Sequence, residues 1–347
     1  MTTTPTTTKP TRMLVRRAIL QALHDEMESD PDVIVMGEDV AVAGGPFKCT
    51  EGLHEAFGPR RVLDTPISEM GFLGAAVGAA ATGLKPVVEI MFVEFIGVAL
   101  DQLTTEATRL RYLSRGEVSV PLVVRSSAGA GLGFGCQHSQ MLDYWFRGVG
   151  GLKVCVVSNA QNAYGLLRAA IRDPDPVVVL EPRVLYGERQ QLTTGEEGIV
   201  ALGEARVVTP GDDVTIVTAG TMVGVTEEAA SLMPGTSCEI IDLQTLVPWD
   251  RRAVVESVRR TGRLVVVEEG PWTGGWSNDI AAHISAELFG SLQAPVLRVT
   301  CPDVPVPHSA ELERRFLPSP EYVAEQTSRL IETSRTPAPW WAGEEKS

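Results

Sequence analysis

The pattern of apolar and polar positions predicts a chain in which strands and helices alternate. Near the start, apolar residues recur at helical spacing, and Asp30-Pro31 ends this predicted helix of residues 14–28. The run DVIVMGED that follows is typical of a short buried strand that ends in acids. Further strands are predicted at RRVLDTP, KPVVEIMF, VPLVVRS, GLKVCVVS and PVVVLEP, and further helices over 68–84, 95–113 and the stretch AQNAYGLLRAAIRD.

This alternation indicates an α/β fold, in which a mainly parallel sheet carries helices on both faces. The pattern breaks after residue 182, and a second series of strands and helices runs from DVTIVTAG to APVLRVT, with helices from about 221, 250 and 276. We therefore expect two doubly wound α/β domains, at 13–190 and 211–335, joined by a linker at 191–210. Residues 1–12, which are rich in Thr and Pro, and residues 336–347 are predicted to be tails.

The composition narrows the class of protein. Of the 347 residues, 44% are hydrophobic but only 6% are aromatic, which suits an aliphatic α/β core. The formal charge of -14 argues against nucleic acid as a partner and against an anionic membrane surface. The apolar stretch 71–100 contains Lys85, Glu89 and Glu94, so we do not expect it to span a membrane. The five cysteines are widely spaced, which predicts free thiols, no zinc site and a cytoplasmic location.

The sequence lacks the common nucleotide and hydrolase motifs. It contains no GxxxxGK[ST], HExxH or GxSxG pattern. The stretch AGAGLGFG (128–135) has a glycine at every second position, so it is not the GxGxxG dinucleotide fingerprint. His138 and Ser139 are adjacent, and adjacent residues seldom face each other as base and nucleophile, which disfavours a serine hydrolase.

Three acids, Glu69, Glu89 and Glu94, lie among small and apolar residues between positions 61 and 95. In the predicted helix after Glu69, Gly74 and Gly78 stand four residues apart and leave one face almost bare of side chains. A glycine inside a helix costs about 1 kcal/mol relative to alanine, so a close contact should compensate for it. That contact is made either with another subunit or within the chain, and the sequence leaves both alternatives open.

Several segments together resemble one family. They are GED (37–39), GPFKCTEGLHEAFGPRRVLDTPISEMGFLGAAVGAAATGLKPVVEIMFVEF, DQLTTEATRLRY, QHSQ (137–140), IDLQTLVPWD and HSAELERRFLPS. They resemble the β subunit of the thiamine-diphosphate-dependent E1 component of 2-oxo acid dehydrogenase complexes, over about residues 13–320. The resemblance implies a transketolase-like pyrimidine-binding domain followed by a transketolase C-terminal-like domain.

The resemblance assigns roles to four side chains. Glu69 matches the family's acid that is hydrogen-bonded to a pyrimidine nitrogen of the cofactor and helps it form the carbanion that attacks a 2-oxo acid. Glu38 matches an acid near the same ring, and Phe95 matches an aromatic residue that stacks on it. His138 matches a histidine at the reaction centre that guides proton transfer or receives the lipoyl group. The simpler alternatives are a helix-stabilising acid, a solvated strand-end acid, a core aromatic residue and a structural loop histidine.

The resemblance also implies ions and partners. The family often holds a potassium ion by backbone carbonyls, which by position would be those of Leu122, Ala170, Asp173 and Asp175. Its diphosphate and magnesium are bound through a GDG…N motif on an α subunit, and this chain has no GDG. We therefore expect an α2β2 assembly in which thiamine diphosphate is shared with the α subunit. A lipoyl acyltransferase, E2, would receive the acyl group and would dock on the second domain.

Two departures from the family pattern concern the substrate pocket and the docking of partners. The usual HxPG turn after QHSQ is RGVGG here, at 147–151, and Gln244 replaces the arginine of DLRT. The function expected from the resemblance is oxidative decarboxylation of a 2-oxo acid with acyl transfer to lipoamide, or cleavage of acetoin. The alternatives are a thiamine-dependent carbon–carbon ligase related to transketolase, and a scaffold subunit without catalysis.

Overall fold

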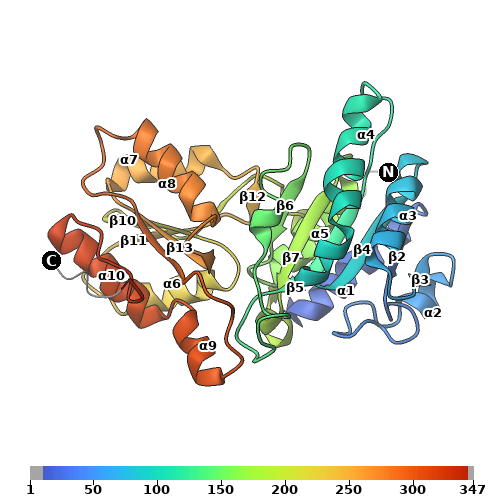
Figure 1. The fold of residues 1–347 in the computed structure, drawn as a ribbon, viewed down its shortest axis with the longest axis horizontal. Coiled ribbons are helices and arrows are strands. Elements are labelled where there is room, and N and C mark those ends of the chain that lie inside the picture. Colours follow the sequence, from blue (N-terminus) through green and yellow to red (C-terminus); the bar gives the residue numbers. More distant parts are fainter. Residues whose placement is uncertain (1–10, 343–347) are drawn as a thin grey trace, which may run out of the picture. The chain divides into compact units, whose positions relative to one another are not determined.

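The computed structural model describes residues 11–342 and divides them into two compact units (Figure 1). The first unit contains the chain up to residue 127 together with 149–202, and the second contains 128–148 and the chain from 203 onward. The segment 128–148 therefore groups with the second unit, although the sequence places it between strands of the first. Residues 1–10 and 343–347, which belong to the predicted tails, lie outside the described residues.

The first unit is built on a parallel sheet. Its strands lie in the order β6-β7-β5-β4-β2-β3, and the pairs β2–β3, β2–β4, β4–β5 and β6–β7 are parallel. The central strands are buried along most of their length, as expected for a sheet that is covered on both faces. The strands are β2 (Val33–Gly37), β3 (Val62–Asp64), β4 (Lys85–Phe92), β5 (Val123–Ala128), β6 (Lys153–Val156) and β7 (Val177–Pro182).

Helices α1 and α5 pack on each other and cover one face of this sheet. Val33 and Val35 of β2 belong to the same hydrophobic core as these helices, while the intervening Ile34 points to the opposite face, on which α3 packs against β4. A short antiparallel ribbon pairs β1 (Thr11–Leu14) with β8 (Arg189–Leu192). The helices are α1 (Val15–Ser29), α2 (Leu53–Phe57), α3 (Glu69–Ala81), α4 (Thr108–Leu113) and α5 (Ala160–Arg172), with 3-10 turns η4 (Arg183–Gly187) and η5 (Glu196–Gly198).

The predicted helix over 95–113 is helical along its whole length but is not a regular α-helix. The structure has a 3-10 turn, η1 (Val93–Ala99), then a π-helical stretch, η2 (Gln102–Ala107), and only then the α-helix α4. Two threonine hydroxyls account for part of this irregularity, because Thr104 donates to the Leu100 carbonyl at 2.9 Å and Thr108 to the Thr104 carbonyl at 2.7 Å. Such bonds compete with the regular backbone ladder of a helix.

The second unit has a smaller sheet in the order β14-β13-β10-β11-β9. Its strands are parallel except β9, which is antiparallel to β11 and lies within the stretch predicted as a linker. The strands are β9 (Arg206–Thr209), β10 (Val214–Thr218), β11 (Cys238–Asp242), β13 (Leu264–Pro271) and β14 (Leu297–Cys301), together with the short β12 (Thr245–Val247).

The helices predicted from about 221, 250 and 276 are confirmed as α6, α7 and α8. The start of α7 has a side-chain cap, since Asp250 accepts a hydrogen bond from the Ala253 amide at 2.9 Å. The unit contains η3 (Asp143–Trp145), α6 (Met222–Ser231), α7 (Arg251–Thr261), α8 (Trp276–Glu287), α9 (Ala310–Phe316) and α10 (Pro320–Thr333). Within residues 11–342, none of the helices is long and apolar enough to cross a membrane.

Candidate active site

Two of the predicted site acids meet where strands of the first unit end. Glu38 directly follows β2, and Glu69 is the first residue of α3, in the connection that leaves β3. The ends of these parallel strands are tied together, because the Thr65 amide donates to the Gly37 carbonyl at 2.9 Å. Burial and, next to it, the charge of Glu69 raise the pKa of Glu38. The fold therefore places two carboxyl groups close together at the edge where open α/β sheets bind ligands.

The surroundings of the acid pair suit a polar ligand. Glu69 is only 9% exposed. Oε1 of Glu38 is buried and has no hydrogen-bond partner within the described part of the chain. A buried polar atom without a partner is costly and is rare unless a ligand or water serves it. The nitrogen-rich pyrimidine ring of thiamine diphosphate is a group that could serve it, so the residues present fit the cofactor that the sequence implies.

Phe95 lies in the same unit, directly after β4. It belongs to η1, which packs against α3. Its ring meets the edge of Phe92 with centroids 5.6 Å apart, and the guanidinium of Arg183 lies 5.0 Å from the centroid of Phe92. Aromatic pairs of this T-shaped kind hold ring orientation. The sequence prediction named Phe95 but not the two residues that support it.

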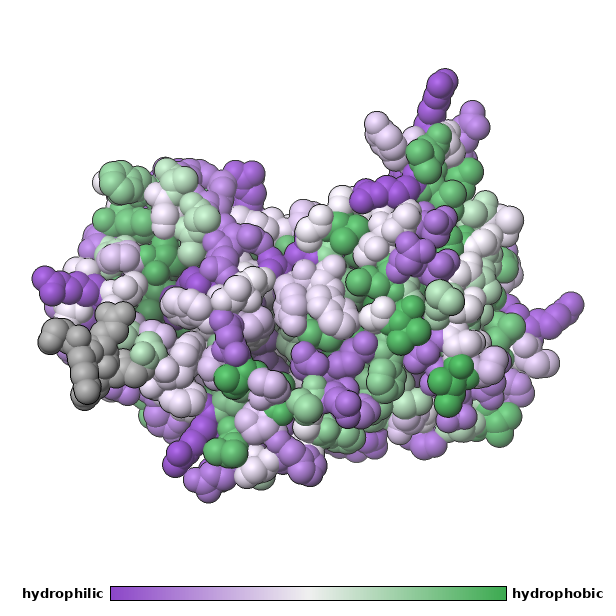
Figure 2. Space-filling view, in the orientation of Figure 1, coloured by the Kyte–Doolittle hydropathy of each residue, from purple (hydrophilic) through white to green (hydrophobic). Residues whose placement is uncertain are grey.

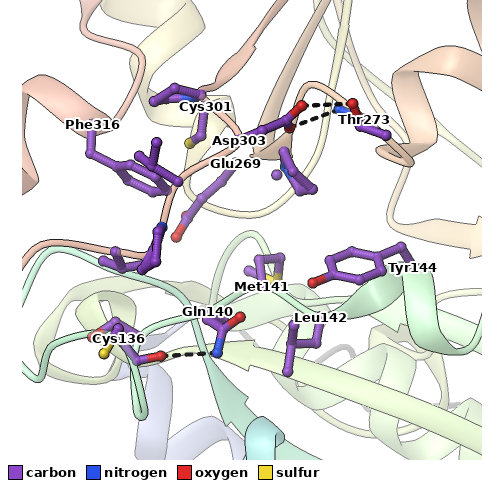
Figure 3. A pocket seen from close by; sticks show the side chains of 17 residues that line it. Cys136, Gln140, Met141, Leu142, Tyr144, Glu269, Thr273, Cys301, Asp303 and Phe316 are labelled. Carbon is purple, nitrogen blue, oxygen red and sulfur yellow. Dashed lines mark hydrogen bonds between the residues drawn. The ribbon is translucent and has the colours of Figure 1, made fainter.

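His138 belongs to the second unit, in the segment 128–148. It is half-buried, and its amide donates to the Gly135 carbonyl at 3.2 Å. The neighbouring residues line a cavity of about 550 Å³ between this segment and the ends of β13 and β14. Figure 3 shows Gln140, Met141 and Leu142 on one side of the cavity and Glu269 and Phe316 on the other.

The four residues predicted to hold potassium lie at one end of β5, β6 and β7. The Leu122 carbonyl accepts the Val177 amide at 2.9 Å, and the Ala170 carbonyl accepts the Asp173 amide at 3.2 Å. The carboxylates of Asp173 and Asp175 hold the ammonium group of Lys153 at 2.6 and 3.5 Å. Each carbonyl oxygen keeps a second lone pair, so these bonds leave the predicted carbonyl ligands available.

The sequence prediction missed a buried ion cluster in the first unit. Arg125 is 2% exposed and donates to both carboxylate oxygens of Glu181, at 2.9 and 2.7 Å, and also to Glu89. Tyr186 donates to Glu181 at 2.7 Å. Burial raises the pKa of Glu89, and Arg125 opposes that effect. Glu89 thus has a structural partner inside the sheet. The charged residues in the middle of apolar strands were a signal that some pairing was needed, but they did not show which residues would pair.

A second buried cluster includes the first residue of the departing stretch RGVGG. Arg147 donates to Asp143 at 2.8 Å, and it also bonds to Asp279 and to the Gly274 carbonyl. Burial, followed by the charge of Glu268, raises the pKa of Asp143 to about 8. Arg147 therefore anchors the segment 128–148 within the second unit.

Gln244, which replaces the arginine of the family pattern, is buried and bonded to the backbone. Its side-chain amide donates to the Glu204 carbonyl at 2.9 Å, and the residue is 3% exposed with a φ of 59°. This hydrogen bond links the connection that follows β11 to the segment that precedes β9, and a buried amide that is satisfied in this way stabilises the link. The departure at 244 thus lies in the interior of the second unit.

The bare face of α3 is exposed at its middle. A side chain added at Gly78 would meet nothing within 4 Å, whereas one at Gly74 would meet Gln102 at 2.8 Å. Close packing within the chain therefore explains Gly74 but not Gly78. Large apolar residues near this helix are exposed too, among them Ile67 at 84% and Val98 at 62%. Figure 2 shows hydrophobic groups reaching the surface of the first unit among polar ones.

Comparison with known proteins gives consistent matches to both units. Residues 11–189 match the transketolase pyrimidine binding domain, and residues 203–323 match the transketolase C-terminal domain. The chain is 45% identical over 330 residues to the mitochondrial pyruvate dehydrogenase E1 component subunit beta-1 of Arabidopsis thaliana, covering 93% of this chain and 90% of that protein. It is 42% identical over 325 residues to the acetoin:2,6-dichlorophenolindophenol oxidoreductase subunit beta of Cupriavidus necator, covering 90% and 96%.

A solved structure shares the fold. It is a split-gene transketolase, in an inactive tetramer of its β chain, with a TM-score of 0.76 and 22% sequence identity over 93% of this chain and 100% of that one. The predicted fold class, two α/β domains of the transketolase type in this order, is confirmed.

Proposed function

Since this chain belongs to the family of E1 β subunits of thiamine-diphosphate-dependent 2-oxo acid dehydrogenases, we propose that its acid pair, Glu38 and Glu69, forms the pyrimidine half of a thiamine diphosphate site. The observation that carries this proposal is the pair itself. Two carboxyl groups lie close together at a ligand-binding sheet edge, and one of them has a buried oxygen without a partner in the described chain. A cluster with a shifted pKa at such an edge is where a functional site is expected.

The side chains have distinct tasks in this proposal. When bound, thiamine diphosphate supplies the nucleophilic carbon that decarboxylation of a 2-oxo acid requires. Glu69 holds a proton against the pyrimidine ring, and Glu38 keeps a second carboxyl group beside it. Phe95 stacks on the same ring, with its orientation supported by Phe92. His138 serves the transfer of the acyl group, for which an imidazole that can act as an acid or a base is suited.

The diphosphate end of the cofactor calls for a partner. The chain has no GDG motif, so we propose that an α subunit supplies the diphosphate and magnesium site in a heterotetramer of two α and two β subunits. The exposed bare face of α3 at Gly78 is in keeping with tight packing against another subunit. A potassium ion held by the carbonyls of Leu122, Ala170, Asp173 and Asp175 is part of the same proposal.

The acyl acceptor and the location complete the proposal. A lipoyl acyltransferase, E2, takes the acyl group, and the enzyme works in the cytoplasm, where the five free cysteines persist as thiols. A second candidate substrate is acetoin, because a relative that is 42% identical is named as an acetoin oxidoreductase subunit. A carbon–carbon ligase and a scaffold subunit receive no support from the names of the two relatives above, which are more than 40% identical.

The experiment that tests the function is reconstitution with an α subunit of the same family. The purified complex is supplied with thiamine diphosphate and magnesium, and turnover of pyruvate, branched-chain 2-oxo acids and acetoin is followed with an artificial electron acceptor. We expect turnover of one of these substrates, and transfer of its acyl group to a lipoylated domain. A complex that assembles and binds the cofactor but turns over none of them would contradict the proposal.

A further inference from the structure

The glycine-rich segment 128–135 has an unusual backbone. Gly129, Gly131, Gly133 and Gly135 all have positive φ, at 86°, 105°, 71° and 75°. Alternating residues of this kind turn successive backbone amides toward a common side, which makes a concave site for an anion. A glycine at every second position, which does not match the dinucleotide fingerprint, is thus explained by these positive φ angles.

The chain's own carboxylates occupy this concave site. Oε1 of Glu313, in α9, accepts the Gly131 amide at 2.8 Å and the Gly133 amide at 3.3 Å, and its Oε2 accepts the Gly133 amide at 3.0 Å. Oε1 of Glu269, near the end of β13, accepts the Ala130 amide at 2.7 Å. The two glutamates are 4% and 7% exposed. Charged acceptors that are buried against backbone amides make strong hydrogen bonds.

The glycines leave room for these carboxylates. A Cβ atom at Gly129 would lie 2.9 Å from Oε1 of Glu269, and one at Gly135 would lie 3.4 Å from Nδ1 of His308. A side chain at position 129 would therefore push the carboxylate away. Glu269, and later in the chain His308 and Glu313, thus lie around one short segment of the second unit.

The held segment leads directly to His138. The His138 amide donates to the Gly135 carbonyl, and the Gly129 amide donates to the Gln140 carbonyl at 3.0 Å. The backbone from 129 to 140 therefore forms a closed loop. His138 lies in its second half, residues 136–140, which we call the returning part. On its other side the returning part borders the cavity of about 550 Å³, into which Glu269 points in Figure 3. The carboxylates of Glu269 and Glu313 bond to the amides of Ala130, Gly131 and Gly133, so they restrain the glycine-rich part of this segment.

We propose that Glu313 and Glu269 are positioning residues that clamp the glycine-rich segment and thereby fix the place of His138. The link to His138 rests on the proposed function, in which that side chain serves acyl transfer. In this proposal the two glutamates act on the segment and not on the reacting groups. Their effect on the reaction passes through the backbone of 129–140, so they govern acyl transfer and leave cofactor binding at Glu38 and Glu69 unaffected.

The experiment compares Glu313→Gln with Glu311→Gln in the reconstituted complex. Glu311 lies in the same helix, but its side chain is exposed and pairs with Arg314 and Arg315. Amide hydrogen exchange over 129–135 reports the clamp directly. We expect exchange about tenfold faster in Glu313→Gln, because a neutral amide replaces a charged acceptor, and unchanged exchange in Glu311→Gln. Unchanged exchange in both variants would overturn the clamp.

Two activities then test the link to His138. We expect Glu313→Gln to lower turnover with a lipoylated acceptor about tenfold while turnover with an artificial electron acceptor stays near that of the unmodified complex. A general structural defect would lower both activities together and would overturn the proposal. Glu269→Gln is the second variant, with the same expectation, should Glu313→Gln fold poorly.

The variant His138→Asn separates this proposal from the proposed function. If it reduces lipoyl-linked turnover but Glu313→Gln, with faster exchange, does not, the positioning role alone is contradicted. If His138→Asn leaves lipoyl-linked turnover unchanged, the acyl-transfer role of His138 fails, and with it the link between the clamp and the reaction.

Discussion

Glu38 and Glu69 lie close enough that the charge of Glu69, after burial, raises the pKa of Glu38. One carboxyl group follows β2 and the other begins α3, so residues about thirty positions apart in the sequence meet at one sheet edge. An acid such as Glu38, whose ionisation is made more costly by burial and by a neighbouring charge, does not benefit the stability of the chain. Such an arrangement is typical of a functional site that is stabilised by its ligand.

Glu38→Gln should therefore stabilise the cofactor-free chain. A carboxyl group with a raised pKa in the folded state does not lower the free energy of unfolding while the pH is below its pKa in the unfolded state. The loss of stability grows as the pH rises and is complete once the pH exceeds the pKa in the folded state. The advantage of the variant should thus appear as the pH rises above about 4.5 and should stay below about 1 kcal/mol, because solvent screens a partly exposed group. Denaturant unfolding at pH 4 and pH 8 measures it, with exposed Glu55→Gln as the control. A variant less stable than the unmodified chain at pH 8 would contradict the interpretation.

Arg125→Met should strongly destabilise the first unit. The substitution leaves the carboxylates of Glu89 and Glu181 buried without their cation, which typically costs about 3–5 kcal/mol. Denaturant unfolding gives the free energy. The matched control is Arg111→Met, which breaks the surface pair with Asp175 and should have a much smaller effect. If both variants lose the same free energy of unfolding, the buried cluster contributes no more to stability than the surface pair.

Asp143 should make stability fall as the pH rises toward 8. Burial and the charge of Glu268 raise the pKa of Asp143 to about 8, so the folded chain holds a proton that the unfolded chain releases above about pH 4. The free energy of unfolding should decline by at most about 1.4 kcal/mol per pH unit between these values. Asp143→Asn should remove this part of the slope, while the exposed Asp279→Asn should keep it. Parallel pH profiles for Asp143→Asn and the unmodified chain would refute the assignment.

Substitutions at Gly78 should separate folding from assembly. Because nothing lies within 4 Å of the added Cβ, Gly78→Ala should stabilise the isolated chain by about 0.5–1 kcal/mol. Gly78→Leu should also fold, but its bulk should block a closely packed partner, so it should not form the heterotetramer. Thermal unfolding and light scattering after mixing with the α subunit measure the two effects. If Gly78→Leu forms the heterotetramer normally, the bare face of α3 does not pack against another subunit.

The sequence predicted what depends on local pattern. Apolar runs and helical spacing were sufficient for the strands of both sheets except β9 and the short β12 and for α1, α5 and α7, and the motif around Glu69 pointed to its family. The helix over 95–113 was predicted, but its 3-10 and π-helical parts were not, because side-chain hydroxyls such as those of Thr104 and Thr108 compete with backbone bonds.

The clusters around Arg125 and Asp143 and the clamp at Glu313 could not be predicted in the same way. Each joins residues from distant parts of the chain, and no periodicity records which distant charge will become a partner. Arg125 and Glu181 are separated by 56 positions, and Gly131 and Glu313 by 182. The alternating glycines were visible in the sequence, but the carboxylates that they receive became apparent only in the folded chain.

The most direct test of the proposed cofactor site is the turnover of a reconstituted complex that carries Glu69→Gln. The substitution keeps the size of the side chain and removes its ability to exchange a proton, so kcat should fall at least about a hundredfold. Assembly with the α subunit should be unaffected, as measured by light scattering, and Glu55→Gln should retain full turnover. A fully assembled Glu69→Gln complex that turns over its substrate at the unmodified rate would contradict the central claim.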